Sequence, residues 1–301
     1  FAHSKKSREL VFALIPSYNV NEITLKQKKT DCLYSALQKG ESIPIEIFPE
    51  INEIFLALQV ENSPLNENMF RDLFLFLDIS LNLQSFLKKD QFLALHQESN
   101  LLYVNPSGQK RIKNIFDDSW QVSRNASPEL NRIYKSIQHA ESSIDKKMNN
   151  LFIKAKKNDW LHGENIQLMD ERKVLPMKAN HKRKIAGITF GQSSTGQVAY
   201  IEPIEVVELR NELIELESAK TTEIFRILLA LTDTFRADLD SILQGYETLV
   251  NIDILVSMAS FANKFECTLP TFCQKDDDLL IRDGMNPSLL IQKKDIVPLN
   301  I

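Results

Sequence analysis

The stretch that decides the fold is residues 127–162, SPELNRIYKSIQHAESSIDKKMNNLFIKAKKNDWLH. Its first two residues are typical of a helix start, because serine caps the first turn and proline fits the first helical position. No glycine or proline follows Pro128 in this stretch, and apolar residues recur at every third or fourth position. The pattern predicts one long helix with a single narrow apolar stripe, formed by Ile133, Ile137, Ala140, Ile144, Met148 and Leu151.

A second run without glycine or proline begins after Pro203 and extends to Gln244. At 1.5 Å per residue, a helix of these ~40 residues spans roughly 60 Å. The sequence therefore predicts two long helices, which pack on each other through their apolar stripes while their charged faces stay in solvent. The stripe of the second helix consists of Leu209, Leu213, Leu216, Ile227, Leu231 and Phe235.

Residues 164–203, between the two helical runs, change from a period of 3.6 to a period of 2. The segments KVLPMKA (173–179), KIAGITF (184–190) and QVAYIEP (197–203) are rich in Val, Ile, Tyr and Phe and are separated by turn-forming residues. We expect short β-strands here. The simplest arrangement is an out-and-back pair of helices that carries this small β module at its far end.

The N-terminal residues are predicted to form short helices joined by loops. Residues 65–89, LNENMFRDLFLFLDISLNLQSFLKK, are apolar on nearly every face of a helix, which is normal for a buried helix. The preceding Ser63 and Pro64 predict where this helix starts. At the other end of the chain, residues 269–301 lose the helical period and favour short strands and turns.

The predicted fold is therefore mainly α: a multi-helical core and two long helices with a small β-rich module inserted between them. We expect the helical core at 1–126, the first long helix at 127–163 and the β module at 164–203. The second long helix, which returns to the core, is expected at 204–268, and residues 269–301 are expected to open a further domain.

The composition of the 301 residues, 43% hydrophobic and 25% charged, is ordinary for a folded chain. No apolar run reaches the length of a membrane span. The sequence starts at Phe1 without a signal-peptide pattern, so we expect a fragment of a longer cytoplasmic protein. The three cysteines (Cys32, Cys267 and Cys273) do not make a disulfide framework and are expected to be reduced thiols.

A local excess of positive charge contrasts with the net charge of −4. From Arg172 to Ile201 the chain has six cations and no aspartate or glutamate. Such cations neutralise phosphates, and nearby polar side chains add hydrogen bonds to phosphate or sugar. The alternative is that they are solvated strand ends beside an ordinary turn. The candidate residues for contact with nucleic acid are Arg172, Lys173, Lys178, His181, Lys182, Arg183, Lys184, Gln192, Ser193, Ser194, Thr195 and Gln197.

Residues 191–198, GQSSTGQV, space two glycines as a phosphate-binding loop does. That loop requires lysine and then serine or threonine after its second glycine, and here Gln197 and Val198 occupy those positions. The residues that follow, VAYIEP (198–203), have the alternating pattern of a strand and end in a proline, so they do not begin a helix. We therefore exclude a nucleotide site and predict a hairpin turn in which Gly196 supplies a positive φ.

No catalytic or metal site is predicted, and the chain is expected to be non-enzymatic and to hold no cofactor. Ser193 and Ser194 are not accompanied by a motif that supplies a base. The five histidines have no metal-ligand spacing. The acidic run Asp276, Asp277 and Asp278 lacks the pattern of a calcium loop.

Residues 170–217, DERKVLPMKANHKRKIAGITFGQSSTGQVAYIEPIEVVELRNELIELE, resemble the region that precedes the ATPase domain in the type-two branch of the MutS family. NASPELNRIYKSI (125–137) is similar to a motif at the same distance upstream in that branch, and SKKSRELVFALIPSYN (4–19) is similar to its N-terminal core. The resemblance covers almost the whole chain and is strongest at 170–217. It implies that 1–126 form a helical core, 127–163 and 204–268 the ascending and descending lever helices, and 164–203 a β-rich clamp inserted between the levers. It also implies that 269–301 are the start of the ATPase domain.

The resemblance also implies a function. It implies the DNA-binding part of a homodimeric ATPase that acts on branched or recombination-intermediate DNA and suppresses recombination. The alternative is a ribosome- or protein-docking scaffold of the same ATPase, which rescues collided ribosomes. ATP and Mg²⁺ would belong to the parent protein, which often carries a C-terminal nuclease-like domain. By the same resemblance, Ile296 and Val297 are expected at the edge of the adenine pocket.

The chain departs from the family pattern at several positions. The usual Gln-Ser-Ala-Ser-Gly has Ser194 and Thr195 at its third and fourth positions, and Gly191 replaces the aspartate before it. Near the end of the chain, Asn286 stands where the family has the histidine of a His-Pro pair. These differences indicate a divergent member, whose partner the resemblance alone does not fix.

Overall fold

The computed structural model describes residues 1–170, 172–272, 279–292 and 296–301. The predicted fold class is confirmed: the chain is mainly helical, with one small antiparallel sheet inserted between two long helices. Two compact units form, Phe1–Lys113 with Leu231–Ile301, and Asn114–Ala230. Cys273 and the acidic run Asp276–Asp278 lie outside the described residues. In the described part, no helix combines the length and the apolar character needed to cross a membrane.

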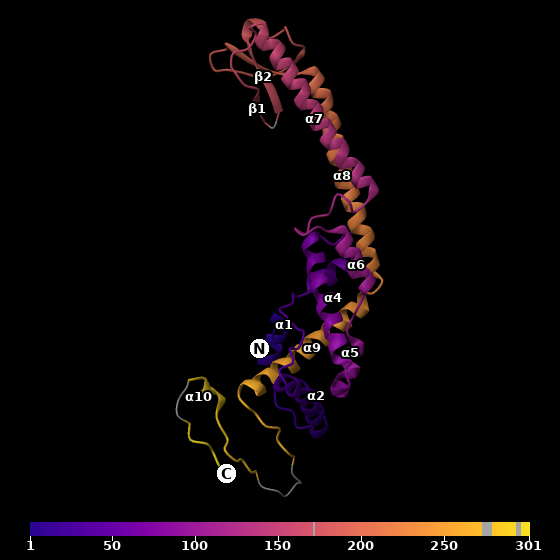
Figure 1. Ribbon diagram of the computed structural model, residues 1–301, viewed down its shortest axis with the longest axis vertical. Helices are drawn as coiled ribbons and strands as arrows, with labels where there is room; N and C mark the ends of the chain where they lie inside the picture. The colour runs from indigo at the N-terminus through magenta and orange to yellow at the C-terminus, as the bar shows by residue number, and fades with distance from the viewer. Residues whose placement is uncertain (171, 273–278, 293–295) are drawn as a thin grey trace. The chain divides into compact units, whose positions relative to one another are not determined.

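The first unit is helical (Figure 1). Its elements are α1 (Lys5–Phe12), α2 (Val20–Gln38), α3 (Asn52–Leu58), α4 (Glu67–Leu87), the 3-10 helix η1 (Asp90–Leu95), α5 (His96–Leu101), most of α6 (Pro106–Ile115), α9 (Leu239–Lys264) and α10 (Pro287–Ile291). The core lies around α4 and α9. Between Ile242 and Ala259, α9 is buried on nearly every side.

The start of α4 differs from the prediction. The helix begins at Glu67, after Asn66, whose side chain accepts a hydrogen bond of 2.9 Å from the backbone N–H of Met69. Ser63 and Pro64 precede the helix because the backbone there bonds elsewhere. The Ser63 carbonyl accepts from Arg236 at 3.0 Å, and the N–H of Leu65 donates to the Thr232 hydroxyl at 2.9 Å. Tertiary contacts therefore override the local start signal.

The second long helix is also shorter than predicted. It ends at Arg236 rather than Gln244, and α9 starts after Asp238. The break coincides with tertiary hydrogen bonds, because Arg236 donates to the Leu58 carbonyl at 2.9 Å and Asp238 accepts from the Tyr103 hydroxyl at 2.7 Å. The absence of glycine and proline did not guarantee a continuous helix. Near the C-terminus, the five-residue α10, capped by Asn286, is a further helix that the pattern did not predict.

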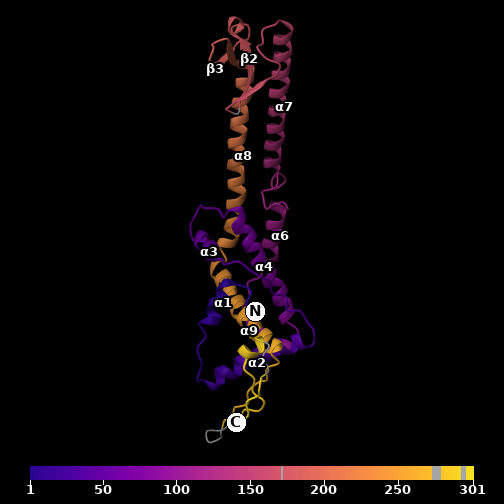
Figure 2. The ribbon, with the colours of Figure 1, turned by 90° about the vertical axis from the view of Figure 1, so that its left-hand side faces the viewer.

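The second unit contains the two long helices, α7 (Pro128–Lys157) and most of α8 (Ile204–Arg236), which run side by side in Figures 1 and 2. Ser127 caps α7 as predicted, because its hydroxyl accepts from the N–H of Leu130 at 3.0 Å. The same hydroxyl, at the start of α7, donates to Glu223 in the C-terminal half of α8 at 2.7 Å. Further along α7, Lys147 pairs with Glu205 at the start of α8. These contacts make the two helices antiparallel.

The sheet between these helices has the strand order β1-β2-β4-β3, and all neighbours are antiparallel. The strands are β1 (Gln167–Met169), β2 (Arg172–Lys178), β3 (Gly187–Gln192) and β4 (Val198–Pro203), and β1 is an addition to the three predicted strands. One sheet face packs on the helices through a buried cluster that includes Met148, Ala155, Leu175, Met177, Ala199, Ile201 and Val206.

Candidate nucleic-acid interface

The end of β2 and the β3–β4 hairpin lie at the same end of the sheet. Lys178, the last residue of β2, is opposite Val198, the first residue of β4. The next backbone N–H, that of Ala179, donates to the carbonyl of Gln197 in the hairpin at 2.9 Å. The short helix η2 (Ala179–His181) and the loop 182–186 follow directly. The end of β2 and the start of η2 are thus brought beside the polar hairpin, whereas Arg172 and Lys173 lie at the opposite end of β2.

The GQSSTGQV stretch forms a hairpin turn, as predicted. The N–H of Ser193 donates to the Val198 carbonyl at 2.9 Å, and the N–H of Gly196 donates to the Ser193 carbonyl at 2.8 Å. Gly196 has a φ of +67°. The Ser193 hydroxyl accepts from the N–H of Val198 at 3.1 Å, so it serves the turn itself. The exposed polar side chains of this hairpin are Gln192, Ser194, Thr195 and Gln197.

Arg172 is engaged inside the unit. Its guanidinium donates to Glu202 at 3.1 Å and stacks on the ring of Phe190 at 4.3 Å. The Glu202 side chain has no exposed area, and Arg210 of α8 makes a second ion pair with it at 3.0 Å, without hydrogen-bond alignment. A buried carboxylate is stable only with opposite charges beside it. Arg172 therefore stabilises the fold through Glu202, unlike the cations of 182–184.

Two further cations of the predicted set have acidic partners at the surface. Lys173 pairs with Asp145 of α7, and Lys178 contacts Asp159 at 2.7 Å. The hydrogen bond from Lys178, its charge and the nearby His181 lower the pKa of Asp159 below its usual value. Asp159 therefore carries its negative charge at neutral pH. Exposed pairs of this kind contribute little to stability, so both lysines remain within reach of an external anion.

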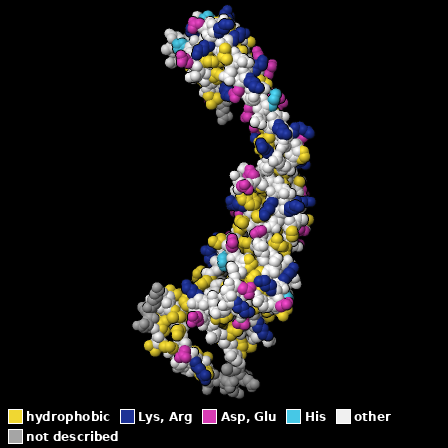
Figure 3. Space-filling view, in the orientation of Figure 1, with side chains coloured by type: hydrophobic (Ala, Val, Ile, Leu, Met, Phe, Trp, Pro, Cys, Tyr) yellow, Lys and Arg dark blue, Asp and Glu magenta, His cyan; other side chains and the backbone are white. Residues whose placement is uncertain are grey.

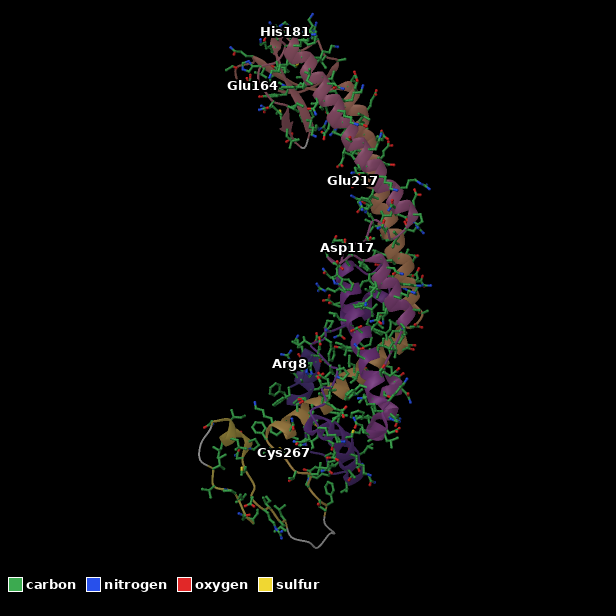
Figure 4. The ribbon with its side chains drawn as sticks, in the orientation of Figure 1. Arg8, Asp117, Glu164, His181, Glu217 and Cys267 are labelled. Atoms are coloured by element: carbon green, nitrogen blue, oxygen red, sulfur yellow. The ribbon has the colours of Figure 1, made fainter. Side chains whose placement is uncertain are left out.

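The remaining cations form an exposed basic loop, Lys182, Arg183 and Lys184, directly after η2. In the part of the chain that the structure describes, these three side chains make no ion pair. His181 is half-buried, and its Nδ1 has no hydrogen-bond partner among the described residues. Figure 4 labels His181 at the end of this unit, and Figure 3 shows Lys and Arg side chains gathered over the same end.

Additional cations at this end lie outside the stretch that the charge pattern selected. The last turn of α7 contributes Lys154, Lys156 and Lys157, all exposed. Residues 154–203 together contain nine Lys and Arg and five Asp and Glu, in a chain whose net charge is −4. The sequence indicated these cations only as a lysine-rich end of the predicted helix. Lysines at a helix C-terminus are also favourable for the helix itself, so the pattern did not point to a binding surface.

The residues expected at an adenine pocket lie in the first unit. Ile296 is partly exposed, and the side chain of Val297 is 90% exposed. A hollow of about 620 Å³ lies elsewhere, beside Tyr134, Lys135 and Gln138 of α7, and includes none of the predicted site residues. The adenine contact therefore stays a prediction that rests on the resemblance.

Comparison with known proteins gives relatives along the whole chain, although no family model matches it. It is 28% identical over 306 residues to the Endonuclease MutS2 of Clostridium botulinum, covering 100% of this chain and 38% of the relative. Over 304 residues it is 25% identical to the Endonuclease MutS2 of Acetivibrio thermocellus, covering 99% and 38%. The chain thus spans 38% of the length of these curated relatives. Similarity of this extent supports a MutS2-like family for this chain.

Proposed function

We propose that this chain binds the sugar–phosphate backbone of DNA through the sheet end of its second unit. The observation that carries the proposal is the exposed basic loop Lys182–Lys184, which makes no ion pair within the described residues. The exposed hairpin side chains at the same end supply neutral donors and acceptors for phosphate or sugar. Contacts of these two kinds position a protein on nucleic acid without reading its sequence.

The names of the relatives support a role in DNA metabolism. We propose that the chain is the DNA-contacting part of a longer MutS-like ATPase that acts on branched or recombination-intermediate DNA. In this proposal α7 and α8 transmit the state of the ATPase to the sheet end, and two copies pair around the DNA. The nuclease activity named in the relatives would reside in a part of the protein other than this basic surface.

Fluorescence anisotropy across a salt series tests the DNA proposal. The ligands are a four-way junction and a linear duplex, and the variant changes Lys182, Arg183 and Lys184 to Ala. We expect the variant to bind about tenfold more weakly or worse, because three phosphate contacts are lost. The slope of log K against log salt should flatten by about 3, or about 1 for each lysine or arginine.

A matched control removes three exposed cations from the first unit, Lys5, Lys6 and Lys28. It has the same net charge as the loop variant, so a general charge effect would weaken both equally. Equal losses, or unchanged affinity in the loop variant, would overturn the assignment of the basic loop. Tighter binding of ribosomal RNA than of the four-way junction would instead favour the ribosome-docking function.

A further inference from the structure

The C-terminal end of α7 is fixed beside the end of β2. After Lys157, the N–H of Asp159 bonds to the Lys156 carbonyl at 3.1 Å, and that of Trp160 bonds to the Ala155 carbonyl at 3.0 Å. The chain then pairs with the sheet, because the Trp160 carbonyl accepts from the N–H of Lys178 at 2.8 Å. The last turn of α7 and the end of β2 are therefore held together by backbone bonds.

This junction carries several cations around one acidic residue. Lys156 and Lys157 are exposed and make no ion pair within the described residues. The charge of Lys154 instead helps to lower the pKa of Glu205 in α8, which pairs with Lys147. Lys178 contacts Asp159, and His181 lies close enough to act on the pKa of Asp159. Asp159 is thus the acidic residue between the α7 lysines and the start of the basic loop.

The Asp159–Lys178 contact is open to competition. The side chain of Asp159 is 89% exposed and that of Lys178 is 33% exposed. Solvent and salt screen such a pair, so it holds its lysine weakly. A phosphate group brings the same kind of oxygen acceptor with a charge at least as large. It therefore competes with the carboxylate for Lys178 wherever it approaches the sheet end.

We propose that the DNA-binding surface extends from the basic loop across Lys178 to Lys156 and Lys157, and that Asp159 limits its affinity by competing with phosphate for Lys178. This inference rests on the proposed function. The occupant is the sugar–phosphate backbone, since the surface offers exposed lysine and arginine side chains, whose charges attract phosphate. The two segments together present a wider row of cations than the loop alone.

Asp159→Asn is a sharp test because it removes the charge and keeps the backbone. Asp159 has a φ of +57°, a conformation that asparagine adopts as readily as aspartate. We expect duplex DNA to bind about two- to fivefold more tightly, with a salt slope steeper by about 1, as one more lysine becomes available to phosphate. Asp170→Asn is the matched control, because Asp170 is also exposed and has a φ of +46°.

The double variant Lys156→Gln, Lys157→Gln tests the extension onto α7. The slope should flatten by about 2, since each lysine that contacts phosphate contributes about 1. Thermal unfolding of the same variant separates this role from a purely structural one. A lower melting temperature with an unchanged salt slope would mean that the lysines only complement the helix C-terminus.

The outcomes distinguish failure of this inference from failure of the proposed function. If the wild-type chain binds no DNA at low salt, the proposed function fails and this extension fails with it. If binding depends on Lys182–Lys184 but is unchanged by Asp159→Asn and by the Lys156/Lys157 variant, only the extension is overturned. Equal effects of Asp159→Asn and Asp170→Asn would show a general charge effect and would also overturn it.

Discussion

Glu202 is a buried charge that holds three elements together. Its carboxylate lies between Arg172 of β2 and Arg210 of α8, at 3.1 Å and 3.0 Å, while Glu202 itself belongs to β4. Removing one partner of a buried ion pair leaves the other charge without compensation, and this costs more than the pair contributes. The residue therefore links the sheet to the start of α8.

Glu202→Gln should lower the free energy of unfolding by about 2–4 kcal/mol, because the two partly exposed arginines lose their counter-charge. Urea denaturation followed by tryptophan fluorescence measures this change. Glu205→Gln, three residues along the chain, is the control, since Glu205 pairs with Lys147 in solvent. A loss no larger than that of the control would show that the buried pair is dispensable.

Two glycines near the interface are required for different reasons. A Cβ at Gly187 would lie 2.3 Å from the Glu202 carbonyl oxygen, whereas one at Gly196 meets nothing within 4 Å. Gly187→Ala should destabilise the unit by about 2–3 kcal/mol through overpacking. Gly196→Ala should cost about 1 kcal/mol, which is the price of a left-handed φ. Urea denaturation of both variants checks this order, and a larger loss at Gly196 would contradict it.

At this scale, sequence predicted which residue types gather but not how they pair. The window Arg172–Ile201 contains no acid, yet its first cation pairs with Glu202, one residue beyond that window. Asp145, which holds Lys173, lies in α7 and is distant in sequence. Charge patterning thus selected residues along the whole of β2, from Arg172 to Lys178, and the loop that follows it. Only the fold separates paired cations from the loop Lys182–Lys184.

Among the elements, those with strong local signals were predicted well. The cap of α7 and the three main strands follow from Ser127, Pro128 and the period-2 pattern. The ends of the helices were not predictable in the same way, because residues far away in sequence set them. Arg236 and Asp238 bond to the segments near Leu58 and Tyr103. The three-residue β1 is too short to give a periodic signal.

The attachment of α1 to α9 gives the first unit a pH dependence. Asp253 of α9 is fully buried and accepts the backbone N–H groups of His3 and Ser4, at 2.9 Å and 3.1 Å, and the His3 ring at 2.7 Å. Burial favours a higher pKa, but these bonds together with Ser7 outweigh it and lower the pKa of Asp253 below its usual 3.8. The ionised carboxylate is thus the form that the fold stabilises.

A carboxylate with a lower pKa in the folded state contributes stability above its unfolded pKa and loses it as the pH falls through the folded one. We expect the first unit to lose stability between about pH 5 and the pKa of folded Asp253. Asp253→Asn should be less stable at pH 7 by about 1–3 kcal/mol, because buried donors lose a charged acceptor. Its stability should also change less with pH in this window. Urea denaturation followed by circular dichroism at several pH values measures both, and an unchanged acid slope would refute the assignment.

At the scale of the whole molecule, the chain has two units with separate cores, and α8 contributes to both. Val206 belongs to the cluster under the sheet, while Phe235 is buried in the first unit. Both tryptophans of the sequence, Trp120 and Trp160, lie in the second unit. Tryptophan fluorescence therefore reports unfolding of that unit, whereas far-ultraviolet circular dichroism reports the helices of both.

We expect the two signals to give transitions that do not coincide in urea, because two cores of different size and composition need not unfold together. Met177→Ala should shift the fluorescence midpoint downward, since truncating a fully buried methionine costs about 2–5 kcal/mol. Leu73→Ala, in the core of the first unit, should lower the urea midpoint of the dichroism transition that belongs to this unit. It should leave the fluorescence midpoint of the second unit unchanged. Both side chains have no exposed area, so the two substitutions are comparable probes. If each variant moved both signals by the same amount, α8 would couple the two units into one cooperative transition. In that case a conformational change at one end of α8 would be transmitted to the sheet end through an intact helix, with no partly unfolded state in between.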